Sequence, residues 1–374
     1  MKRIQFDNII DDLNKKMVFI TGPRQVGKTW LAKEISKKFN KTLYLNFDDF
    51  DDRTIILERS WNKSTELLIF DELHKMDNWK TYIKGVFDNK KDFLKILVTG
   101  SARLHTFKKG GDSLAGRFFL HRLMPFCLTE LQINNYNHGL EKLINRGGFP
   151  EPFLSKTDTE ASRWRNLYVN GLIREDILDF SNISELKKME LLVELLRRRV
   201  GSPVSFKSIA EDLNLSPVTV SKYVDILESL FIIFKVSPFS KNISRSILKE
   251  SKIYFFDNGM VIGDEGKKLE NFVGVSLLKH CFLNEDLTGE KLNLNYIRTK
   301  DGKEVDFCIS DNIKIKKIIE VKKSKTNFSE NLFYFSRKYN LEAVQIVKNL
   351  DKEKQIENIE LKDIENFLLN LKIL

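Results

Sequence analysis

The sequence is poor in cysteine, histidine and long apolar runs, and each scarcity excludes a class of protein. Its 374 residues include three cysteines, far apart and each in an apolar stretch: Cys127, Cys281 and Cys308. This spacing excludes a disulfide framework or a CxxC site, and it indicates buried thiols in a reducing compartment. The five histidines show no ligand spacing, so no zinc site is expected.

Membrane-spanning segments are not expected either. No apolar run approaches the roughly 20 residues that a transmembrane helix needs. The first residues, MKRIQFDNIIDDLNKK, lack the apolar centre of a signal peptide. We therefore expect a cytoplasmic protein with no membrane partner.

The chain has a length, a composition and a charge that fit a soluble protein of several domains. Hydrophobic residues make up 42% and charged residues 30%, which excludes wholesale disorder, and 374 residues exceed one typical core. The net charge of +10 makes a polyanionic partner plausible. Because the lysines are spread along the chain, a merely solvated basic surface explains the charge as well.

Short apolar runs mark two regions of strands. The runs at 17–21, 43–47, 67–70 and 94–98, separated by helical or polar segments, predict buried strands of a mostly parallel α/β sheet. Helical periodicity replaces them from about 126 to 200, and two short helices with a strand-like tail follow up to about 240. Beyond 246 we expect mixed α/β structure, with strands near 252–256, 293–298, 304–309 and 315–322. The sequence thus predicts a multidomain α/β protein divided into 1–125, 126–200, 201–245 and 246–374.

The segment GPRQVGKT satisfies the P-loop (Walker A) pattern G-x-x-x-x-G-K-[ST] between an apolar strand and a helix. Its glycines let the backbone wrap phosphates, and loop N–H groups and the helix N-terminus point at the anion. Lys28 is expected to neutralise the β- and γ-phosphates, and the Thr29 hydroxyl to bind Mg²⁺. The predicted contacts of an ATP molecule are Gly22, Pro23, Arg24, Gln25, Val26, Gly27, Lys28, Thr29 and Trp30.

A second strand carries the acids that such a site needs. LLIFDE, residues 67–72, is an apolar run that ends in Asp71 and Glu72, the pattern of a Walker B strand. We expect Asp71 to hold Mg²⁺ and Glu72 to orient and polarise the attacking water. An acid placed to activate water favours hydrolysis over phosphoryl transfer to another substrate.

Polar residues after the next strand are candidates for sensing the γ-phosphate. In LKILVTGSAR, Thr99 and Ser101 lie at the strand tip, where an ordinary strand-ending turn is an equally good explanation. Arg103 and Arg117 are candidates to stabilise transition-state charge, within one chain or across a subunit boundary, and Arg117 is favoured. A surface or salt-bridge role is the ordinary explanation for either arginine.

A family resemblance extends over nearly the whole chain. The segments GPRQVGKT, LLIFDELHK, VTGSARL, SLAGRFFLHRLMPFCLTEL and GGFPEPFL resemble a prokaryotic AAA-type ATPase family with a conserved C-terminal domain of unknown function. KLENFVGVSLL, YIRTKDGKEVDF and IIEVK resemble that C-terminal domain. The resemblance implies an AAA-like core, a helical segment, a winged-helix-like module and a restriction-endonuclease-like end. His74 departs from the family, whose members often carry glutamine after the Asp-Glu pair.

Residues 205–236 form the pattern of a helix-turn-helix. A helix is predicted over Phe206–Leu213, and a second begins with Ser216 as N-cap and Pro217 at its first position. FIIFKV then predicts the first strand of a wing. Residues expected at a DNA groove are Thr219, Ser221 and Lys222. A purely structural packing module is the alternative, because the exposed helix face carries one lysine and one aspartate.

The C-terminal strands carry the residue types of a metal-dependent nuclease. Asp306 and the pair Glu320 and Lys322 lie on the polar faces of two strands, and a turn at 311–312 brings those faces together. Two carboxylates would hold Mg²⁺, and the lysine would position the attacking water or stabilise the charge that develops on phosphorus. The resemblance adds Glu270 as a further acid, which completes the PD-(D/E)xK order with Val305 in place of proline. Any half-buried strand shows the same alternation.

Three functions fit these motifs. The first is an ATP-hydrolysing, Mg²⁺-dependent homo-oligomer that acts on DNA through the winged-helix-like module and a nuclease-like C-terminal domain. The second is an ATPase whose C-terminal domain has lost catalysis and only binds DNA or a protein. The third is a nucleotide-controlled regulator or scaffold with little hydrolysis.

Overall fold

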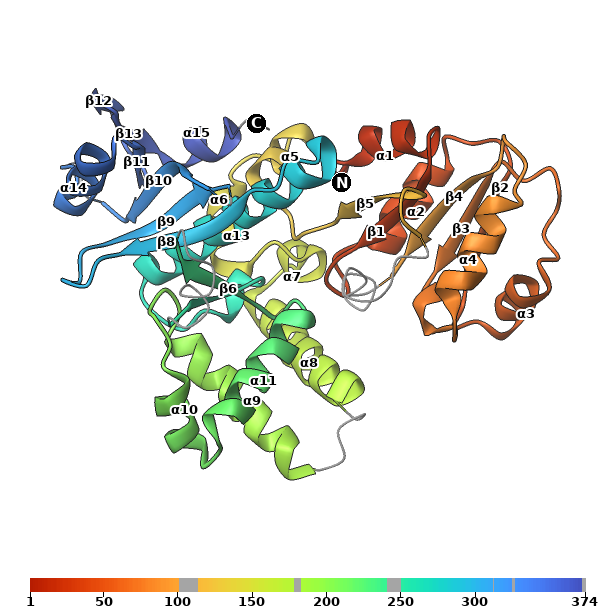
Figure 1. Ribbon diagram of the computed structural model, residues 1–374, viewed down its shortest axis with the longest axis horizontal. Helices are drawn as coiled ribbons and strands as arrows, with labels where there is room; N and C mark the ends of the chain where they lie inside the picture. The colour runs from red at the N-terminus through yellow and green to blue at the C-terminus, as the bar shows by residue number, and fades with distance from the viewer. Residues whose placement is uncertain (101–113, 178–182, 241–249, 312, 325–326, 372–374) are drawn as a thin grey trace. The chain divides into compact units, whose positions relative to one another are not determined.

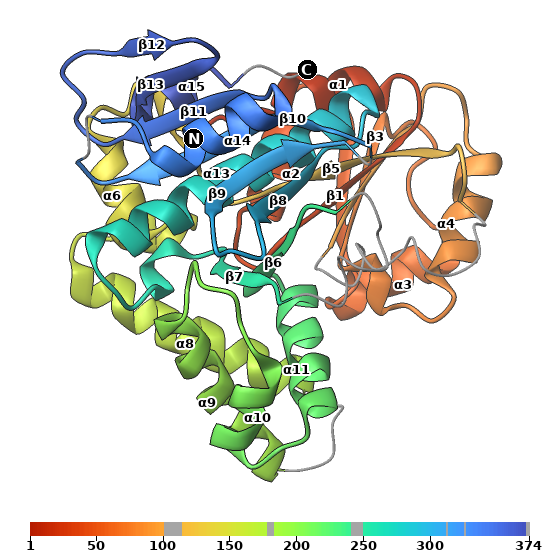
Figure 2. The same cartoon turned by 60° about the vertical axis from the view of Figure 1, so that its left-hand side comes forward.

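The chain folds into two compact units in the computed structural model, an N-terminal unit (1–124) and a C-terminal unit (125–374). The structure describes all residues except 101–113, 178–182, 241–249, 312, 325–326 and 372–374. Figures 1 and 2 show the ribbons of both units in two views. Each unit is described by itself below.

A parallel sheet in the order β2-β3-β4-β1-β5 forms the centre of the N-terminal unit. Its strands are β1 (Met17–Thr21), β2 (Thr42–Asn46), β3 (Leu67–Asp71), β4 (Lys95–Thr99) and β5 (Phe118–Arg122). The helical elements are α1 (Phe6–Leu13), α2 (Lys28–Ser36), α3 (Phe50–Glu58), η1 (Leu73–Lys75) and α4 (Trp79–Asp88). The four strand runs predicted up to residue 98 are confirmed, each within one residue of the observed ends.

Strands β1 and β3 are buried along their whole length, because helices cover both faces of the sheet. On one face, alternate strand residues such as Phe19, Phe70 and Val98 pack with side chains of α3, η1 and α4. Helices α1 and α2 contact the sheet through β1, β3 and β4. Two-sided burial explains why these strands read as continuous apolar runs in the sequence.

The C-terminal unit has a mixed sheet in the order β12-β13-β11-β10-β9-β8-β6-β7. Its strands are β6 (Ile233–Pro238), β7 (Lys252–Phe255), β8 (Asn293–Arg298), β9 (Glu304–Ser310), β10 (Ile315–Lys322), β11 (Glu342–Val347), β12 (Lys354–Ile356) and β13 (Ile359–Asp363). The four strands predicted beyond residue 246 are confirmed. Strands β8, β9 and β10 are antiparallel, whereas β11 runs parallel to β10.

Helices precede and surround this sheet. They are α5 (Leu128–Ile133), α6 (Gly139–Arg146), α7 (Pro150–Leu154), α8 (Asp158–Ile177), α9 (Ile183–Arg198), α10 (Phe206–Leu213), α11 (Pro217–Ser229), η3 (Asn258–Met260), α13 (Glu265–Thr288), α14 (Glu330–Tyr339) and α15 (Ile364–Leu369). The long helix α13 packs along β8, β9 and β10 (Figure 2). Its Asn271 side chain bonds both the N–H and the C=O of Phe255, at 2.8 and 2.9 Å, which fixes β7 to the helix.

The helix-turn-helix segment is continuous with the C-terminal sheet. Helix α10 has the predicted bounds, and Ser216 caps α11 by accepting the Thr219 N–H at 3.0 Å. Strand β6 then pairs antiparallel with β7, as a wing hairpin would, and also parallel with β8. The boundary expected at 245/246 lies in the undescribed segment 241–249, and strands from both sides of it share one sheet.

Candidate functional site

The nucleotide-binding loop joins the C-terminal end of β1 to α2. Gly22 has φ 148°, and a Cβ there would lie 2.1 Å from the carbonyl oxygen of Leu123, so only glycine fits. Gly27 (φ 99°) and Gln25 (φ 59°) also turn the backbone through positive φ. These turns carry the chain tightly around the position where phosphates bind and into the N-terminus of α2.

The Lys28 ammonium is folded back into the loop. Its Nζ donates to the carbonyl oxygens of Gly22 (3.1 Å) and Pro23 (2.6 Å), and the residue is buried. Burial lowers the pKa of Lys28 to about 8, against the opposing effect of the Glu72 and Asp71 carboxylates. The loop therefore holds a desolvated cation, a favourable partner for a phosphate oxygen.

Three strand ends meet beside the loop. Asn46, Asp71 and Thr99 are paired across β2, β3 and β4, so their side chains lie at one edge of the sheet. The Asp71 carboxylate accepts hydrogen bonds from Thr29 Oγ1 (2.7 Å) and from Thr99 Oγ1. The predicted Walker A and Walker B residues are thus in direct contact, although 42 positions separate Thr29 from Asp71 in the chain.

Tyr44 is a site residue that the sequence analysis missed. Its hydroxyl donates to Asp71 Oδ2 at 2.6 Å from the neighbouring strand β2. Burial and the Asp71 carboxylate raise its pKa, so the phenol stays protonated and remains a donor. The available signal was a hydroxyl-bearing side chain in an otherwise apolar strand run.

Glu72 lies just beyond the strand tip in a left-handed conformation (φ 55°). Its carboxylate is 3.4 Å from His74 Nε2, and its N–H donates to the Thr99 carbonyl. Burial, and next the Asp71 charge, raise the pKa of Glu72. A partly buried carboxylate with a raised pKa is a candidate general base. His74 lies against this carboxylate.

The other residues predicted to lie at the nucleotide differ in burial and in their hydrogen-bond partners. Val26 is buried, so only its backbone is available to phosphates, whereas Trp30 is 43% exposed on α2. Ser101 and Arg103 lie outside the described residues. The Thr99 hydroxyl, predicted to sense the γ-phosphate, donates a hydrogen bond to the Asp71 carboxylate.

Arg117 does not contact the nucleotide loop of its own chain. It precedes β5, and its carbonyl accepts from the N–H of Met17 at the amino end of β1. The loop begins five residues further along β1, roughly 16 Å away at a strand's rise per residue. Its guanidinium instead binds Asp88 at 2.8 and 3.2 Å. A charge-stabilising role for Arg117 would therefore have to be exerted on the nucleotide of another subunit, one of the two arrangements expected from the sequence.

The donor set at the N-terminal site fits a magnesium ion. Thr29 and Asp71 present a hydroxyl and a carboxylate, the hard oxygen ligands that Mg²⁺ prefers when it is bound together with nucleotide phosphates. The Lys28 ammonium of the same loop would neutralise phosphate charge. These residues would hold the ion through few protein ligands, as P-loop enzymes do.

In the C-terminal unit, the predicted acids lie in two groups. Glu320, on β10, is 2.6 Å from Lys322 Nζ through one oxygen, while its Oε2 is buried without a hydrogen-bond partner. Burial, and next the Asp306 charge, raise the pKa of Glu320 to about 7. Asp306 Oδ2 accepts the N–H of Val321 at 2.9 Å.

Glu270 and the other oxygen of Asp306 belong to a second group, which Lys252 joins. Lys252 Nζ lies 3.5 Å from Glu270, 3.8 Å from Asp306 and 2.7 Å from Glu304. Among the described residues, no group of three or more His, Cys, Asp or Glu side chains is placed to hold a metal ion. The expected Mg²⁺ ligand set of Glu270, Asp306 and Glu320 is therefore not formed, because a lysine lies between two of its members.

The helix-turn-helix residues lie partly at the surface. Lys222 is exposed on α11, and Thr219 and Ser221 are half-buried. Val218, 79% exposed, extends the same outer face. Val220, Val224 and Leu227 are buried, as the predicted core stripe requires.

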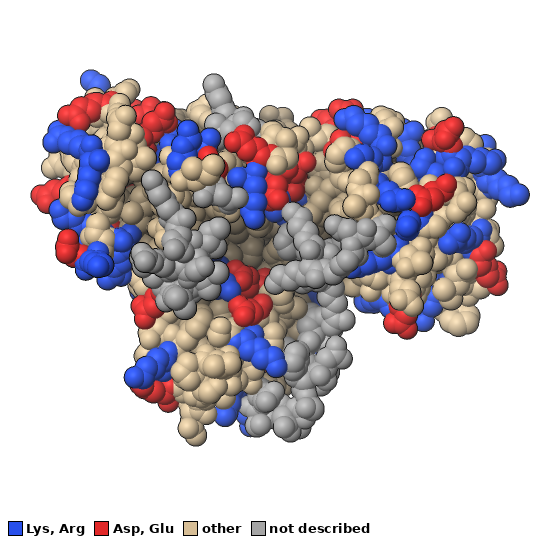
Figure 3. Space-filling view, in the orientation of Figure 1, with Lys and Arg blue, Asp and Glu red and all other residues tan. Residues whose placement is uncertain are grey.

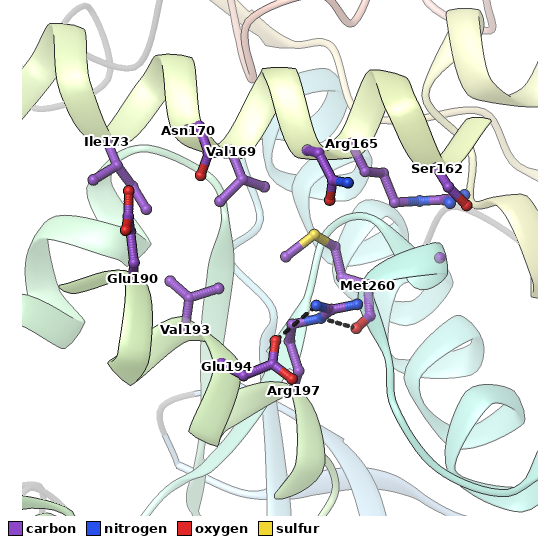
Figure 4. Close-up of a pocket in the computed structure, with 12 residues that line it drawn as sticks. Ser162, Arg165, Val169, Asn170, Ile173, Glu190, Val193, Glu194, Arg197 and Met260 are labelled. Carbon is purple, nitrogen blue, oxygen red and sulfur yellow. Dashed lines mark hydrogen bonds and ion pairs between the residues drawn. The ribbon is translucent and has the colours of Figure 1, made fainter. Parts of the chain in front are cut away.

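A cavity of about 250 Å³ lies apart from the predicted residues, between α8, α9 and η3. Val169, Val193 and Met260 form its apolar part, and the Arg197 guanidinium binds the Met260 carbonyl and Glu194 at its rim (Figure 4). Sequence patterns gave no sign of it, because its lining comes from three separate elements.

Comparisons with known proteins agree with the N-terminal site. Residues 14–132 match the family described as an AAA domain, in agreement with the P-loop and the acid-bearing strand described above. Residues 137–263 and 265–368 match two families described as domains of unknown function. In the part of the chain that the structure describes, no helix is both long and apolar enough to cross a bilayer.

Relatives in other organisms are similar over most of the chain. The uncharacterized protein MJ1544 of Methanocaldococcus jannaschii is 26% identical over 343 residues, which cover 82% of this chain and 75% of that protein. An uncharacterized protein of Haemophilus influenzae is 22% identical and covers 94% and 93% of the two chains. Among solved structures, a Walker-type ATPase of Pyrococcus abyssi has a TM-score of 0.41 at 14% identity, covering 68% of this chain and 93% of its own.

Proposed function

We propose that the protein hydrolyses ATP at the P-loop of its N-terminal unit, with Mg²⁺ as cofactor. The observation that carries this proposal is the 2.7 Å hydrogen bond between Thr29 and Asp71. It brings the end of the phosphate loop and the acid strand together at the edge of the sheet. The match of residues 14–132 to an AAA domain supports the same activity.

The roles of the residues follow from the geometry. Loop N–H groups and the N-terminus of α2 bind the phosphates, and Lys28 exchanges the Gly22 and Pro23 carbonyls for phosphate oxygens. Thr29 and Asp71 would hold the magnesium ion, which neutralises charge on the β- and γ-phosphates when bound. Glu72 accepts a proton from the attacking water, for which its raised pKa suits it.

Phosphate release from ATP by the purified chain tests this proposal. Turnover should require Mg²⁺ and should be lost in Lys28→Ala. The matched control is Lys38→Ala, an exposed lysine just after α2, which should keep full turnover. Equal turnover in the two variants would contradict the assigned site.

A homo-oligomer is the second part of the proposal. Because Arg117 is remote from the phosphate loop of its own chain, it can act only on the nucleotide of a neighbouring subunit. ATP turnover per chain should then fall on dilution and on Arg117→Ala. Specific activity that does not depend on concentration would remove this part of the proposal.

For the C-terminal unit we propose binding of DNA through α10, α11 and the β6–β7 hairpin. The capped second helix, its outward Lys222 and the antiparallel hairpin support a winged-helix-like module. On the face seen in Figure 3, basic and acidic side chains are interspersed, so on that face a helix in the groove is a better candidate contact than a broad basic surface.

The order α13-β8-β9-β10-α14-β11 supports a PD-(D/E)xK-like fold for residues 265–347. Of the two alternatives for this domain, cleavage or binding alone, the position of Lys252 favours binding alone. Incubation of DNA with Mg²⁺ or Mn²⁺ should leave it intact. Cleavage that is lost in Asp306→Ala and in Lys322→Ala would instead establish a nuclease.

A further inference from the structure

Lys252 is a fully buried lysine at the centre of three carboxylates. Its side chain is 1% exposed on β7, at the edge of the C-terminal sheet. Glu304, at 2.7 Å, and Asp306, at 3.8 Å, come from β9, and Glu270, at 3.5 Å, comes from α13. The ring of Tyr296, with its centroid 5.5 Å from Nζ, forms a further wall.

The carboxylates keep this ammonium charged. Burial by itself would lower the pKa of Lys252, but the carboxylates of Glu270, Asp306 and Glu304 outweigh it and raise the pKa above its ordinary value. A buried ammonium is tolerated only when it is paired and hydrogen-bonded. Lys252 is therefore a buried cation that its paired carboxylates stabilise.

The charge of the cluster leaves no place for a divalent cation. Arg298 also binds Glu304, at 3.3 Å, so two cations face three carboxylates. With all three carboxyl groups ionised the net charge is −1, and a divalent ion would change it to +1 in a largely buried centre, at a large cost in desolvation. Lys252 already contacts both Glu270 and Asp306, the two acids that a metal ion would have to bridge.

The segment just before α10 also lies against Glu270. Tyr254 Oη donates to Glu270 at 2.7 Å, and a Cβ at Gly201 would lie 2.8 Å from a Glu270 oxygen. The backbone of Pro203 pairs with that of Lys252 in an isolated antiparallel β-bridge. The cluster therefore joins the entry of the helix-turn-helix, the hairpin strand β7, helix α13 and strand β9.

We propose that Lys252 is an internal cation that replaces a divalent metal ion between Glu270, Glu304 and Asp306. The cluster is then a metal-independent junction that fixes the helix-turn-helix hairpin to the nuclease-like sheet. This inference goes beyond the ATPase activity and does not depend on it. It predicts that removal of the lysine exposes a latent site for a divalent cation.

Hydrogen exchange of peptides covering β7 and β9 tests the proposal on the full chain without nucleotide. An Asp71→Asn background removes the N-terminal metal site. With Lys252 present, exchange should be the same in EDTA and in Mn²⁺. In Lys252→Ala, exchange should be faster in EDTA, and Mn²⁺ at about ten times its Kd should slow it about tenfold.

Lys279→Ala is the matched control, because Lys279 is equally buried but binds a single carboxylate, Glu130, at 2.6 Å. The Lys279→Ala chain should be less stable than the parent, and its hydrogen exchange should not respond to Mn²⁺. Two results would overturn the proposal: Mn²⁺ protection of these peptides with Lys252 present, or a Lys252→Ala variant that exchanges as slowly as the parent in EDTA. If Lys252→Ala does not fold, direct Mn²⁺ binding to the Asp71→Asn chain decides, since one bound ion there would refute the inference.

Discussion

Tyr44 and Asp71 are joined by a 2.6 Å hydrogen bond between neighbouring strands β2 and β3. Together with Thr29 and Thr99, Tyr44 makes a third hydroxyl that donates to one carboxylate. The three hydroxyl donors fix the orientation of the carboxylate, so Tyr44 is a positioning residue of the proposed magnesium site.

Tyr44→Phe should lower ATP turnover and raise the Mg²⁺ concentration needed for half-maximal rate. A hydrogen bond to a charged group contributes about 1.5–3 kcal/mol, so a decrease in ATP turnover of about 10- to 150-fold is expected. Tyr82→Phe is the control, because its hydroxyl donates to the Ile56 carbonyl in the core of the same unit. A Mg²⁺ titration of turnover distinguishes positioning from loss of fold; equal curves for both variants would exclude the role of Tyr44.

Gly22→Ala should disrupt both the loop and the packing beneath it. The added Cβ would meet the Leu123 carbonyl oxygen at 2.1 Å, in a backbone conformation that L-residues avoid. Loss of nucleotide binding and destabilisation of the N-terminal unit by about 1–3 kcal/mol are expected. Gly171→Ala, where a Cβ meets nothing within 4 Å, should be harmless. Fluorescent-nucleotide binding and thermal unfolding measure both effects, and normal binding by Gly22→Ala would be inconsistent with this geometry.

Glu320 should make the C-terminal sheet less stable as pH rises from about 5 to 7. Its folded-state pKa, about 7, exceeds the ordinary 4.5, so in this range the folded state binds more protons than the unfolded state. The unfolding free energy therefore falls with rising pH, on the order of 2 kcal/mol for this group, and levels off above pH 7.

Glu320→Gln should flatten that dependence, and Glu342→Gln, whose side chain is 71% exposed, should not. Hydrogen exchange of β9 and β10, corrected for its intrinsic pH dependence, gives the opening free energy. An identical slope in Glu320→Gln and the parent chain would show that this carboxyl does not titrate as described.

Lys222→Ala should weaken DNA binding and its salt dependence. One lost phosphate contact lowers the slope of log K against log salt by about 0.9. Lys352→Ala, just before β12 at the opposite edge of the sheet from the β7 hairpin strand, is the charge-matched control. Salt titrations of a labelled duplex measure both slopes. Equal slopes in the two variants would mean that DNA binds away from Lys222 or does not bind to this chain.

Local patterns predicted the strands and the phosphate loop because their causes are local. Continuous apolar runs correspond to strands buried on both faces, and GPRQVGKT fixes its own turns through glycine. The Ser216 cap and the bounds of α10 were predictable for the same reason. Asp71 and Thr99 were assigned to the site because adjacent parallel strands end at the same edge.

Contacts between distant segments were not predictable. Lys252 lies in an apolar strand run, and nothing nearby in the sequence indicates that Glu270 and Glu304 surround it. Arg117 was chosen by residue type alone, and only the register of β5 with β1 shows that it lies at the end of the sheet opposite the phosphate loop of its own chain. In both cases the deciding fact is which strands pair and in which register.

ATP turnover by Glu72→Gln tests the central claim most directly. The variant keeps the size and most contacts of the side chain but cannot accept a proton from water. Its turnover should fall at least about 100-fold, within the range that general-base catalysis supplies, while nucleotide binding stays within a few-fold of the parent. Glu58→Gln, an exposed glutamate at the end of α3, should hydrolyse ATP normally. Parental turnover in Glu72→Gln would contradict the account of this site.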